Sequence, residues 1–430
     1  MNYQEALSYI NDKDKYGSRL GLHSITRLME LLGNPQNDLK YIHVAGTNGK
    51  GSTSSYLANC LKSAGYKVGL YTSPYLERFN ERIQINGVNI PDEDLAVITS
   101  KVRDKADIMV KEGMHHPTTF EIVTAIAFVF FQQENIDYVV LEVGLGGRFD
   151  STNVIETSLA SVITTLDYDH INELGNTLSE IAFQKAGIIK ENGIVVSYPQ
   201  EEEAWNVLMD VARKNNAEIY LEPTKNINIK SQNEFGSKFD FIYKDIVLEG
   251  IETSMIGHYQ IYNACLAIYT ILLLREKNLV NITNKQIYEG VKATKWKGRL
   301  EVLRRNPTFL IDGAHNLQGI TNLSEALKLF KYDKLILGVS ILKDKDHKTM
   351  VELLGPLADK AVSTEVKMPR KLDSEILAEE LKEYVPEVYV AKEIEDAVLK
   401  TIELANDNDL IVFAGSLYMI GEVRSIVNLL

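Results

Sequence analysis

Residues 41–65 read YIHVAGTNGKGSTSSYLANCLKSAG. Residues 41–45 are mostly apolar and predict a short buried strand, and residues 46–52 form a glycine-rich turn. A helix is expected over about residues 52–64, with Gly65 as its stop. This order of strand, turn and helix is typical of a phosphate-binding loop, because backbone N–H groups and a helix N-terminus then face phosphate oxygens.

The turn carries the residue types that nucleotide binding requires. Lys50 is placed to contact β- and γ-phosphates, and the hydroxyl of Ser52 or Thr53 could approach a bound Mg²⁺. The strict pattern G-x-x-x-x-G-K-[ST] is not met, because Val44 and Gly51 interrupt it. A plain glycine-containing turn is the alternative, but the lysine and hydroxyls favour ATP. The predicted nucleotide-binding residues here are Gly46, Thr47, Asn48, Gly49, Lys50, Gly51, Ser52 and Thr53.

Length and composition exclude several classes of protein. A chain of 430 residues is long for one hydrophobic core, so we expect two domains. The net charge of -13 disfavours general nucleic-acid binding, although it does not exclude a small anionic substrate. Two cysteines give no disulfide framework, the N-terminus lacks the pattern of a signal peptide, and the longest apolar run, residues 122–131, is too short to span a bilayer. We therefore expect a cytoplasmic protein without membrane contact.

Strand-like runs alternate with helix-like runs almost throughout, which predicts the α/β class with mainly parallel sheets. Between residues 218 and 250, short alternating runs suggest small antiparallel strands appended to the main sheet. The strand–helix alternation restarts near Lys295. We therefore predict a larger domain over residues 1–294 and a smaller α/β domain over residues 295–430.

Polar residues follow several predicted strands of the larger domain. Ser73 follows the strand at 67–72, Glu142 comes late in the strand at 137–143, and His170 follows the strand at 159–165. Ligands bind beyond the carboxyl ends of parallel strands, and Mg²⁺ prefers hard oxygen ligands. The alternatives are a buried Glu142 paired with Arg148 and a histidine that caps the next helix.

Eight short motifs occur in one order along the chain, and the series is more specific than any single member. They are Gly46-Thr-Asn-Gly-Lys-Gly-Ser52, Thr72-Ser-Pro74, Phe79-Asn-Glu-Arg-Ile83, Glu142-Val-Gly-Leu-Gly-Gly-Arg148, Lys185-Ala-Gly-Ile188, Gly298-Arg-Leu-Glu301, Asp312-Gly-Ala-His-Asn316 and Gly415-Ser-Leu-Tyr418. Over nearly the whole chain this series resembles the folylpolyglutamate synthases, including the bifunctional dihydrofolate synthase/folylpolyglutamate synthases, of the Mur ligase superfamily. Tyr75, Gln184 and Lys297 depart from the commoner residues at their positions.

The resemblance implies an N-terminal P-loop-type ATPase domain and a C-terminal Rossmann-like domain. It also implies a reaction in which ATP phosphorylates a substrate carboxylate and the amino group of L-glutamate attacks the acyl phosphate. Folate or dihydropteroate would be the acceptor and Mg²⁺ the cofactor. A monovalent cation is left open, and we expect a monomer.

Further residues take roles from the same resemblance. Expected metal ligands are Ser73, Glu142, His170 and Lys185, the last as a carbamate. Expected catalytic residues are Lys50, Lys185 and His315, with His315 as general base or orienting group. Asn263, Arg299 and Asp312 join the nucleotide site, and Phe120, Asp150 and Ser416 are expected to bind substrate.

Lys185 can also be interpreted from spacing alone. A capping box at residues 177–180 begins a predicted helix over 178–189, and Lys185 falls on its apolar face. Spacing by itself favours a lysine whose stem packs inward while its amine reaches water. The resemblance reverses that preference in favour of a buried, carbamylated amine.

Three other functions share part of the pattern. A small-molecule kinase would release a phosphorylated product, and a nucleotide switch would hydrolyse ATP without a response to glutamate. Another Mur-type ligase, joining an amino acid to a cell-wall precursor, is the nearest competitor. The ordered motif series favours the folate ligase over all three.

Overall fold

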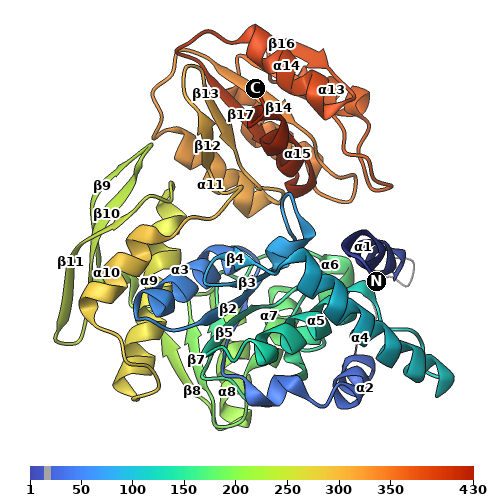
Figure 1. The fold of residues 1–430 in the computed structure, drawn as a ribbon. Coiled ribbons are helices and arrows are strands. Elements are labelled where there is room, and N and C mark those ends of the chain that lie inside the picture. Colours follow the sequence, from blue (N-terminus) through green and yellow to red (C-terminus); the bar gives the residue numbers. More distant parts are fainter. Residues whose placement is uncertain (14–20) are drawn as a thin grey trace. The chain divides into compact units, whose positions relative to one another are not determined.

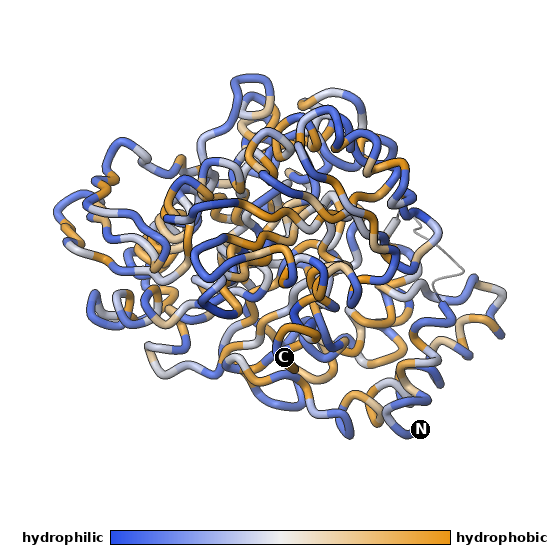
Figure 2. The backbone as a smooth tube through the Cα atoms, turned by 90° about the horizontal axis from the view of Figure 1, so that it is seen from above, coloured by the Kyte–Doolittle hydropathy of each residue, from blue (hydrophilic) through white to orange (hydrophobic). Residues whose placement is uncertain are grey.

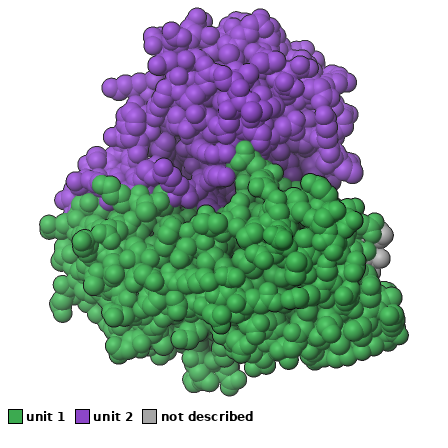
Figure 3. Space-filling view, viewed as in Figure 1, with its two compact units in different colours: residues 1–227, 241–251, 262–294 green, residues 228–240, 252–261, 295–430 purple. Residues whose placement is uncertain are grey.

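The computed structural model describes residues 1–13 and 21–430 (Figure 1). The chain forms two compact units, coloured separately in Figure 3. Unit 1 comprises residues 1–227, 241–251 and 262–294, and unit 2 comprises residues 228–240, 252–261 and 295–430. Each unit contains its own sheet and covering helices, so the predicted α/β class is confirmed.

Unit 1 is built on an eight-stranded sheet in the order β4-β3-β2-β5-β1-β6-β7-β8. The six strands from β2 to β8 in this order run parallel, and β3 and β4 are antiparallel additions at the β2 edge. The strands are β1 (Tyr41–Ala45), β2 (Val68–Tyr71), β3 (Ile83–Ile85), β4 (Val88–Asn89), β5 (Tyr138–Glu142), β6 (Ala160–Ile163), β7 (Ile194–Ser197) and β8 (Glu218–Leu221). Because β1 lies centrally, its carboxyl end and the phosphate loop are flanked by the ends of β5 and β6.

The helices of unit 1 cover this sheet. They are α1 (Tyr3–Asp12), α2 (His23–Leu31), α3 (Lys50–Ser63), α4 (Asp92–Lys111), α5 (Thr119–Gln133), α6 (Ile171–Leu174), α7 (Leu178–Lys185), α8 (Glu202–Lys214) and α10 (Asn284–Ala293), while α9 (His258–Glu276) runs from unit 2 into unit 1. Helix α5 is buried from Glu121 to Phe131 and begins with a capping box at Thr118. Its apolar side chains join those of β1, β2 and β5 in one hydrophobic cluster. Along the tube in Figure 2, hydrophobic and hydrophilic stretches alternate, as amphipathic helices around apolar strands require.

The stretch from residue 218 to residue 250 differs from its prediction in two ways. β8 pairs parallel with β7 and is the edge strand of the main sheet. The strands β9 (Ile227–Asn233), β10 (Gly236–Tyr243) and β11 (Ile246–Thr253) form a separate three-stranded sheet, so they are not appended to the main sheet. The alternating pattern identified strands correctly, but it contains no information about which sheet each strand joins.

Unit 2 holds a six-stranded sheet in the order β12-β13-β17-β14-β15-β16. Its strands are β12 (Glu301–Arg304), β13 (Thr308–Ile311), β14 (Leu335–Val339), β15 (Lys360–Ser363), β16 (Glu387–Val390) and β17 (Leu410–Ala414). All neighbours are parallel except β12, which pairs antiparallel with β13 and was missed in the sequence because it is short and only half-buried. The helices are α11 (Leu317–Leu327), α12 (His347–Leu354), α13 (Ser374–Leu381), α14 (Ile394–Leu404) and α15 (Leu417–Val427).

Two further findings concern the helices. The helix predicted over residues 178–189 has its capping box at Thr177, but α7 ends at Lys185 and a 3₁₀ turn, Ala186–Ile188, completes it. Among the described residues, no helix has both the length and the apolar character needed to cross a membrane.

Glu222 is an isolated buried acid at the end of β8. Its side chain is 1% exposed, and neither carboxyl oxygen has a hydrogen-bond partner among residues 1–13 and 21–430. Its electrostatic interactions include those with Tyr198, Tyr262, Cys265 and Tyr269. None of these four side chains is a cation. Desolvation raises the pKa of Glu222 to about 8, so the folded chain keeps this carboxyl neutral at pH 7.

We predict that Glu222 makes the stability of the chain fall as pH rises. An unfolded chain ionises this carboxyl above about pH 4.5, whereas the folded chain keeps the proton to about pH 8. The contribution of Glu222 to the free energy of unfolding is therefore fully present below pH 4.5. It is lost as the pH rises towards 8, at about 1.4 kcal/mol per pH unit. Glu222→Gln should weaken this dependence and raise the thermal unfolding midpoint at pH 8 relative to the wild type.

The control is Glu218→Gln, at the start of the same strand. Glu218 is exposed and its ion pair with Lys277 lowers its pKa, so it is ionised in both states between pH 5 and pH 8. Equal pH dependence of the midpoint in the wild type and in Glu222→Gln would contradict the assignment.

Candidate active site

The phosphate loop leaves β1 and is fastened to the end of β6. The Thr47 amide donates to the carbonyl of Thr165 at 2.7 Å, and the Thr47 hydroxyl donates to the carbonyl of Asp167 at 2.9 Å. The Thr164 hydroxyl donates to the carbonyl of Asn48 at 2.6 Å. The loop is thus held to the sheet, and Gly49, near its end, is the N-cap residue of α3.

Glycine is required at two positions of this loop. Gly46 has φ +154°, and a Cβ there would overlap the hydroxyl of Thr164. Gly49 has φ +86° and precedes α3, and a Cβ there would lie 2.5 Å from Oδ1 of Asn263. The structure therefore brings Asn263, on α9, against the loop as the nucleotide-site prediction requires.

Two lysine amines meet at one backbone carbonyl. Nζ of Lys50 donates to the carbonyls of Gly46 and Thr47, each at 3.1 Å, and Nζ of Lys185 donates to the Gly46 carbonyl at 2.8 Å. Lys185 is 5% exposed, so its amine does not reach water as spacing alone suggested. Desolvation first, and the neighbouring Lys50 charge second, lower the pKa of Lys185 to about 7.

Ser73 and Glu142 lie together at the ends of β2 and β5. The amide of Ser73 donates to Oε2 of Glu142 at 3.1 Å, and Glu142 is 4% exposed. Arg148, the alternative partner for Glu142, instead stacks on Phe183 with its guanidinium 3.9 Å from the ring centre.

The donor set tests whether Mg²⁺ fits here. Within residues 1–13 and 21–430, no three His, Cys, Asp or Glu side chains are grouped to hold a metal ion. A site would therefore need the Ser73 hydroxyl and a modified Lys185 beside the Glu142 carboxylate. These are hard oxygen donors once Lys185 carries a carbamate, so the residues fit Mg²⁺.

His170 lies at the start of α6 in a left-handed conformation, with φ 51°. Its side chain is 43% exposed, and its backbone amide donates to Oδ1 of Asp169 at 2.9 Å. Its side chain does not cap α6. The expected metal ligand is thus more solvated than Glu142.

A tight turn over residues 144–147 follows β5. A Cβ at Gly144 would overlap the ring of Phe120, so the tip of that ring lies against the turn. Oδ2 of Asp150 accepts from the amide of Leu145 at 2.8 Å, and Oδ1 accepts from the amide of Thr152 at 3.0 Å. Burial raises the pKa of Asp150, and these hydrogen bonds oppose the shift. The two expected substrate residues, Phe120 and Asp150, therefore share one turn.

In unit 2, Asp312 ties two loops together at the end of β13. Its carboxylate accepts from the amides of Leu300 and Ala314, each at 2.8 Å. The guanidinium of Arg299 lies against Gly313, where a Cβ would overlap it. Burial raises the pKa of Asp312, and the Arg299 charge opposes that shift.

His315 and Ser416 follow β13 and β17, which are neighbouring parallel strands. Nδ1 of His315 lies 2.7 Å from the carbonyl of Gly313, which can only accept, so Nδ1 carries a proton, and in the neutral ring Nε2 carries the lone pair. Ser416 is 2% exposed, and its hydroxyl has no hydrogen-bond partner among the described residues.

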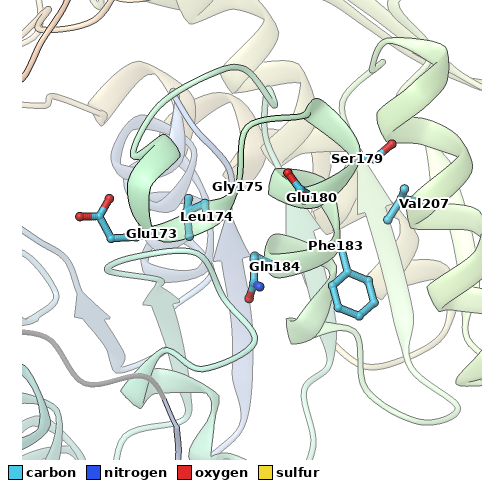
Figure 4. Close-up of a pocket in the computed structure, with 8 residues that line it drawn as sticks. All are labelled: Glu173, Leu174, Gly175, Ser179, Glu180, Phe183, Gln184 and Val207. Atoms are coloured by element: carbon cyan, nitrogen blue, oxygen red, sulfur yellow. The ribbon is translucent and has the colours of Figure 1, made fainter.

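A pocket of about 510 Å³ lies between α6, α7 and α8 (Figure 4). Its lining residues are Glu173, Leu174, Gly175, Ser179, Glu180, Phe183, Gln184 and Val207. None of these eight belongs to the phosphate loop, so we do not assign the nucleotide to it.

Comparison with known proteins accounts for both units. Residues 44–271 match the Mur ligase middle domain, and residues 298–417 match the Mur ligase glutamate ligase domain. The dihydrofolate synthase/folylpolyglutamate synthase of Bacillus subtilis is 37% identical and aligns over 98% of each chain. Mycobacterium tuberculosis folylpolyglutamate synthase complexed with ADP has a TM-score of 0.90 at 29% identity over 99% of each chain. Escherichia coli FolC in complex with DHPP and ADP has a TM-score of 0.88 at 26% identity, covering 100% of this chain and 98% of that one.

The chain belongs to the Mur ligase family. Its relatives are folylpolyglutamate synthases and dihydrofolate synthases, so the resemblance inferred from the motif series is confirmed. The chain is accordingly an ATP-dependent, ADP-forming ligase.

Several residues that shape this ligase site were missed in the sequence. Thr164 and Thr165 hold the phosphate loop, and Thr152 and His43 stand behind Asp150. A histidine inside the apolar stretch 41–45 is a detectable signal, because a buried polar side chain needs a partner. The threonines resemble ordinary strand residues, and only the fold reveals their contacts.

We predict that Gly49→Ala weakens nucleotide binding by this Mur ligase. The substitution places a side chain in the left-handed region and pushes its Cβ onto Asn263, which must then move from the loop. ADP affinity, measured by titration calorimetry, should fall by about tenfold or more.

Gly65→Ala is the matched control. Gly65 has φ +92°, close to that of Gly49, but open space surrounds its Cβ position. This variant should lose about 1 kcal/mol of stability and keep its ADP affinity. Equal ADP affinity in both variants would show that contact with Asn263 does not shape the site.

Proposed function

We propose that this ligase uses ATP to activate the carboxylate of a folate or dihydropteroate and joins it to L-glutamate through an acyl phosphate. The observation that carries the proposal is the pair of amines, from Lys50 and Lys185, on the carbonyl of Gly46. A carboxylate does not react with an amine until it has a good leaving group, and phosphorylation supplies one. The names of the relatives in Bacillus subtilis and Mycobacterium tuberculosis support the substrate class.

Lys50 would neutralise β- and γ-phosphate charge at the N-terminus of α3 during phosphoryl transfer. We propose Gly46, Thr47, Asn48, Gly49, Gly51, Ser52, Thr53 and Asn263 as the further nucleotide contacts of unit 1. Arg299 and Asp312 are proposed nucleotide contacts from unit 2. We propose residues 1–294 and 295–430 as the functional domains and propose that turnover requires both.

Ser73, Glu142, His170 and carbamylated Lys185 would hold Mg²⁺, which supplies charge screening for the anionic reactants. Lys185 is prepared for this modification by its own surroundings. Carbamylation adds CO₂ to a neutral amine and releases a proton, and a desolvated amine beside Lys50 loses its proton readily.

His315 is the proposed base for the incoming amine. With a proton on Nδ1, the neutral ring has Nε2 as its acceptor, which is the state that a base requires. Phe120 and Asp150 are proposed to contact the acceptor heterocycle, and Ser416 to contact substrate in unit 2. We further propose that the enzyme is a cytoplasmic monomer. A monovalent cation beside Mg²⁺ is a separate proposal that dialysis against potassium-free buffer would test.

Turnover with defined acceptors tests the function directly. The purified full chain, with ATP and Mg²⁺, should release phosphate only when L-glutamate and either dihydropteroate or tetrahydrofolate are present. The product mass should rise by one glutamyl residue. Glutamate-independent phosphate release would indicate a nucleotide switch, and a stable phosphorylated acceptor would indicate a kinase; either result would contradict the proposal.

We predict that Lys185→Ala is nearly inactive and is partly restored by a short carboxylic acid such as acetate. The acid would supply the anionic oxygens that the carbamate provides in the wild type. Activity should be measured against acetate concentration at constant ionic strength, with chloride as the salt control.

Lys190→Ala is the matched variant. Lys190 is also a largely buried lysine whose pKa is lowered by burial, to about 8, but its amine binds Asn153 and Ile155. Any activity lost in this variant should not return with acetate. Full activity in Lys185→Ala without acid would rule out the carbamate.

A further inference from the structure

His43 is a buried polar residue that the proposed chemistry does not use. It lies on β1, three residues before Gly46, and its side chain is fully buried. The strand pairs with β5 on one side and β6 on the other, so His43 stands at the centre of the sheet. A buried imidazole costs free energy unless it is hydrogen-bonded, so its partner indicates its role.

The hydrogen-bond partner of His43 connects it to the turn over residues 144–147, here called the acceptor turn because Phe120 and Asp150 beside it are the proposed contacts of the acceptor. Nε2 of His43 lies 2.9 Å from Oγ1 of Thr152, and Oγ1 of Thr152 lies 2.5 Å from Oδ1 of Asp150. All three side chains are buried, with exposures of 0%, 0% and 6%. They form a continuous chain from the central strand to the turn after β5.

The direction of each proton in this chain follows from the chemistry of the groups. The single hydroxyl proton of Thr152 is donated to the Asp150 carboxylate. The hydroxyl oxygen must then accept from His43, so His43 carries its proton on Nε2. Consistent with this tautomer, Nδ1 of His43 has no hydrogen-bond partner among the described residues. Burial lowers the pKa of His43 well below its usual value, which keeps the ring neutral.

Asp150 links the hydrogen bonds of His43 and Thr152 to the turn over residues 144–147. Its other oxygen, Oδ2, accepts from the amide of Leu145 at 2.8 Å, next to Gly144 and the ring of Phe120. A carboxylate rotated about its Cβ–Cγ bond would lose the Leu145 amide and release the turn. The hydroxyl of Thr152 opposes that rotation, and His43 holds the hydroxyl.

We propose that His43 and Thr152 are positioning residues that fix the Asp150 carboxylate and, through it, the subsite for the acceptor heterocycle. This inference rests on the proposed function, because it assigns Phe120 and Asp150 to that acceptor. The hydrogen-bond chain ends at the 144–147 turn, whereas the phosphate loop is held separately by Thr164 and Thr165. We therefore expect it to act on acceptor binding and not on nucleotide binding.

Substitutions that keep or remove each donor test the chain by steady-state kinetics. His43→Leu removes the Nε2 donor, and Thr152→Val removes the hydroxyl at nearly constant shape. Each should raise KM for the pteridine acceptor roughly three- to tenfold, as expected for one lost hydrogen bond, with KM for ATP within twofold of the wild type. His43→Gln and Thr152→Ser keep a donor at the same place and should restore the acceptor KM.

The double variant separates a chain from two independent contacts. Without the Thr152 hydroxyl, His43 no longer acts on Asp150, so His43→Leu should add nothing to the acceptor KM of Thr152→Val. Multiplicative effects on KM would overturn the proposal. So would an acceptor KM that is unchanged in both single variants, or a loss confined to kcat and thermal stability.

Nitrogen NMR with ¹⁵N-labelled histidine measures the protonation of His43 in the wild-type protein, and the conservative variant His43→Gln serves only to assign its signal. His43 should give a neutral, Nε2-protonated signal that does not titrate between pH 5.5 and 8.5, assigned by its absence in His43→Gln. An Nδ1-protonated or titrating His43 would refute the proposed hydrogen-bond chain from His43 through Thr152 to Asp150. Wild-type enzyme without glutamate-dependent turnover on any pteridine would instead refute the proposed function, and the NMR result would still test the hydrogen-bonded chain.

Discussion

Two lysine amines share the carbonyl of Gly46, and the geometry of unit 1 depends on that contact. Lys50 reaches the carbonyl from α3 and Lys185 reaches it from α7. Two ammonium groups on one acceptor repel each other, and the burial of Lys185 weakens the screening of that repulsion by solvent. Desolvation first, and this repulsion second, lower the pKa of Lys185 to about 7, so that Lys185 readily gives up its charge. The loop therefore has beside it one amine, that of Lys185, which loses its proton near neutral pH.

The contact also explains why segments far apart in the sequence converge. For its carbonyl to face both amines, Gly46 adopts φ +154° with the Thr164 hydroxyl where a Cβ would be. The loop must then bind the end of β6, and α7 must stop where Lys185 reaches inward. A 3₁₀ turn ends that helix, and the carbonyl of Gln184 accepts from the amide of Arg148 at 2.7 Å, fastening the turn after β5. Backbone groups thus take part in each connection: the carbonyl of Gly46 binds Lys185, the carbonyl of Thr165 binds the phosphate loop, and the carbonyl of Gln184 binds the turn after β5.

Much of this could be predicted from the sequence, and the reasons for the failures are physical. The strand–turn–helix pattern at 41–65 located the phosphate loop, since glycines and a helix start are local signals. The capping box at Thr177 located α7, but residue spacing alone could not decide whether the amine of Lys185 is buried or solvated. The partners of His43, and the separate sheet of β9 to β11, depend on contacts over long sequence separations. Periodicity contains no information on such pairing.

The acidity of the chain is compatible with a site for polyanions. A net charge of -13 acts through solvent and is screened within about 8 Å at physiological ionic strength. Lys50 and Lys185 act at contact distance from the loop, where screening is weak. The buried acids of unit 1 named above already accept hydrogen bonds. Asp150 accepts them from a backbone amide and a hydroxyl, and Glu142 accepts one from the amide of Ser73. Their negative charge is thereby partly compensated before any substrate arrives, so the distant acidic surface governs solubility while the local cations govern binding.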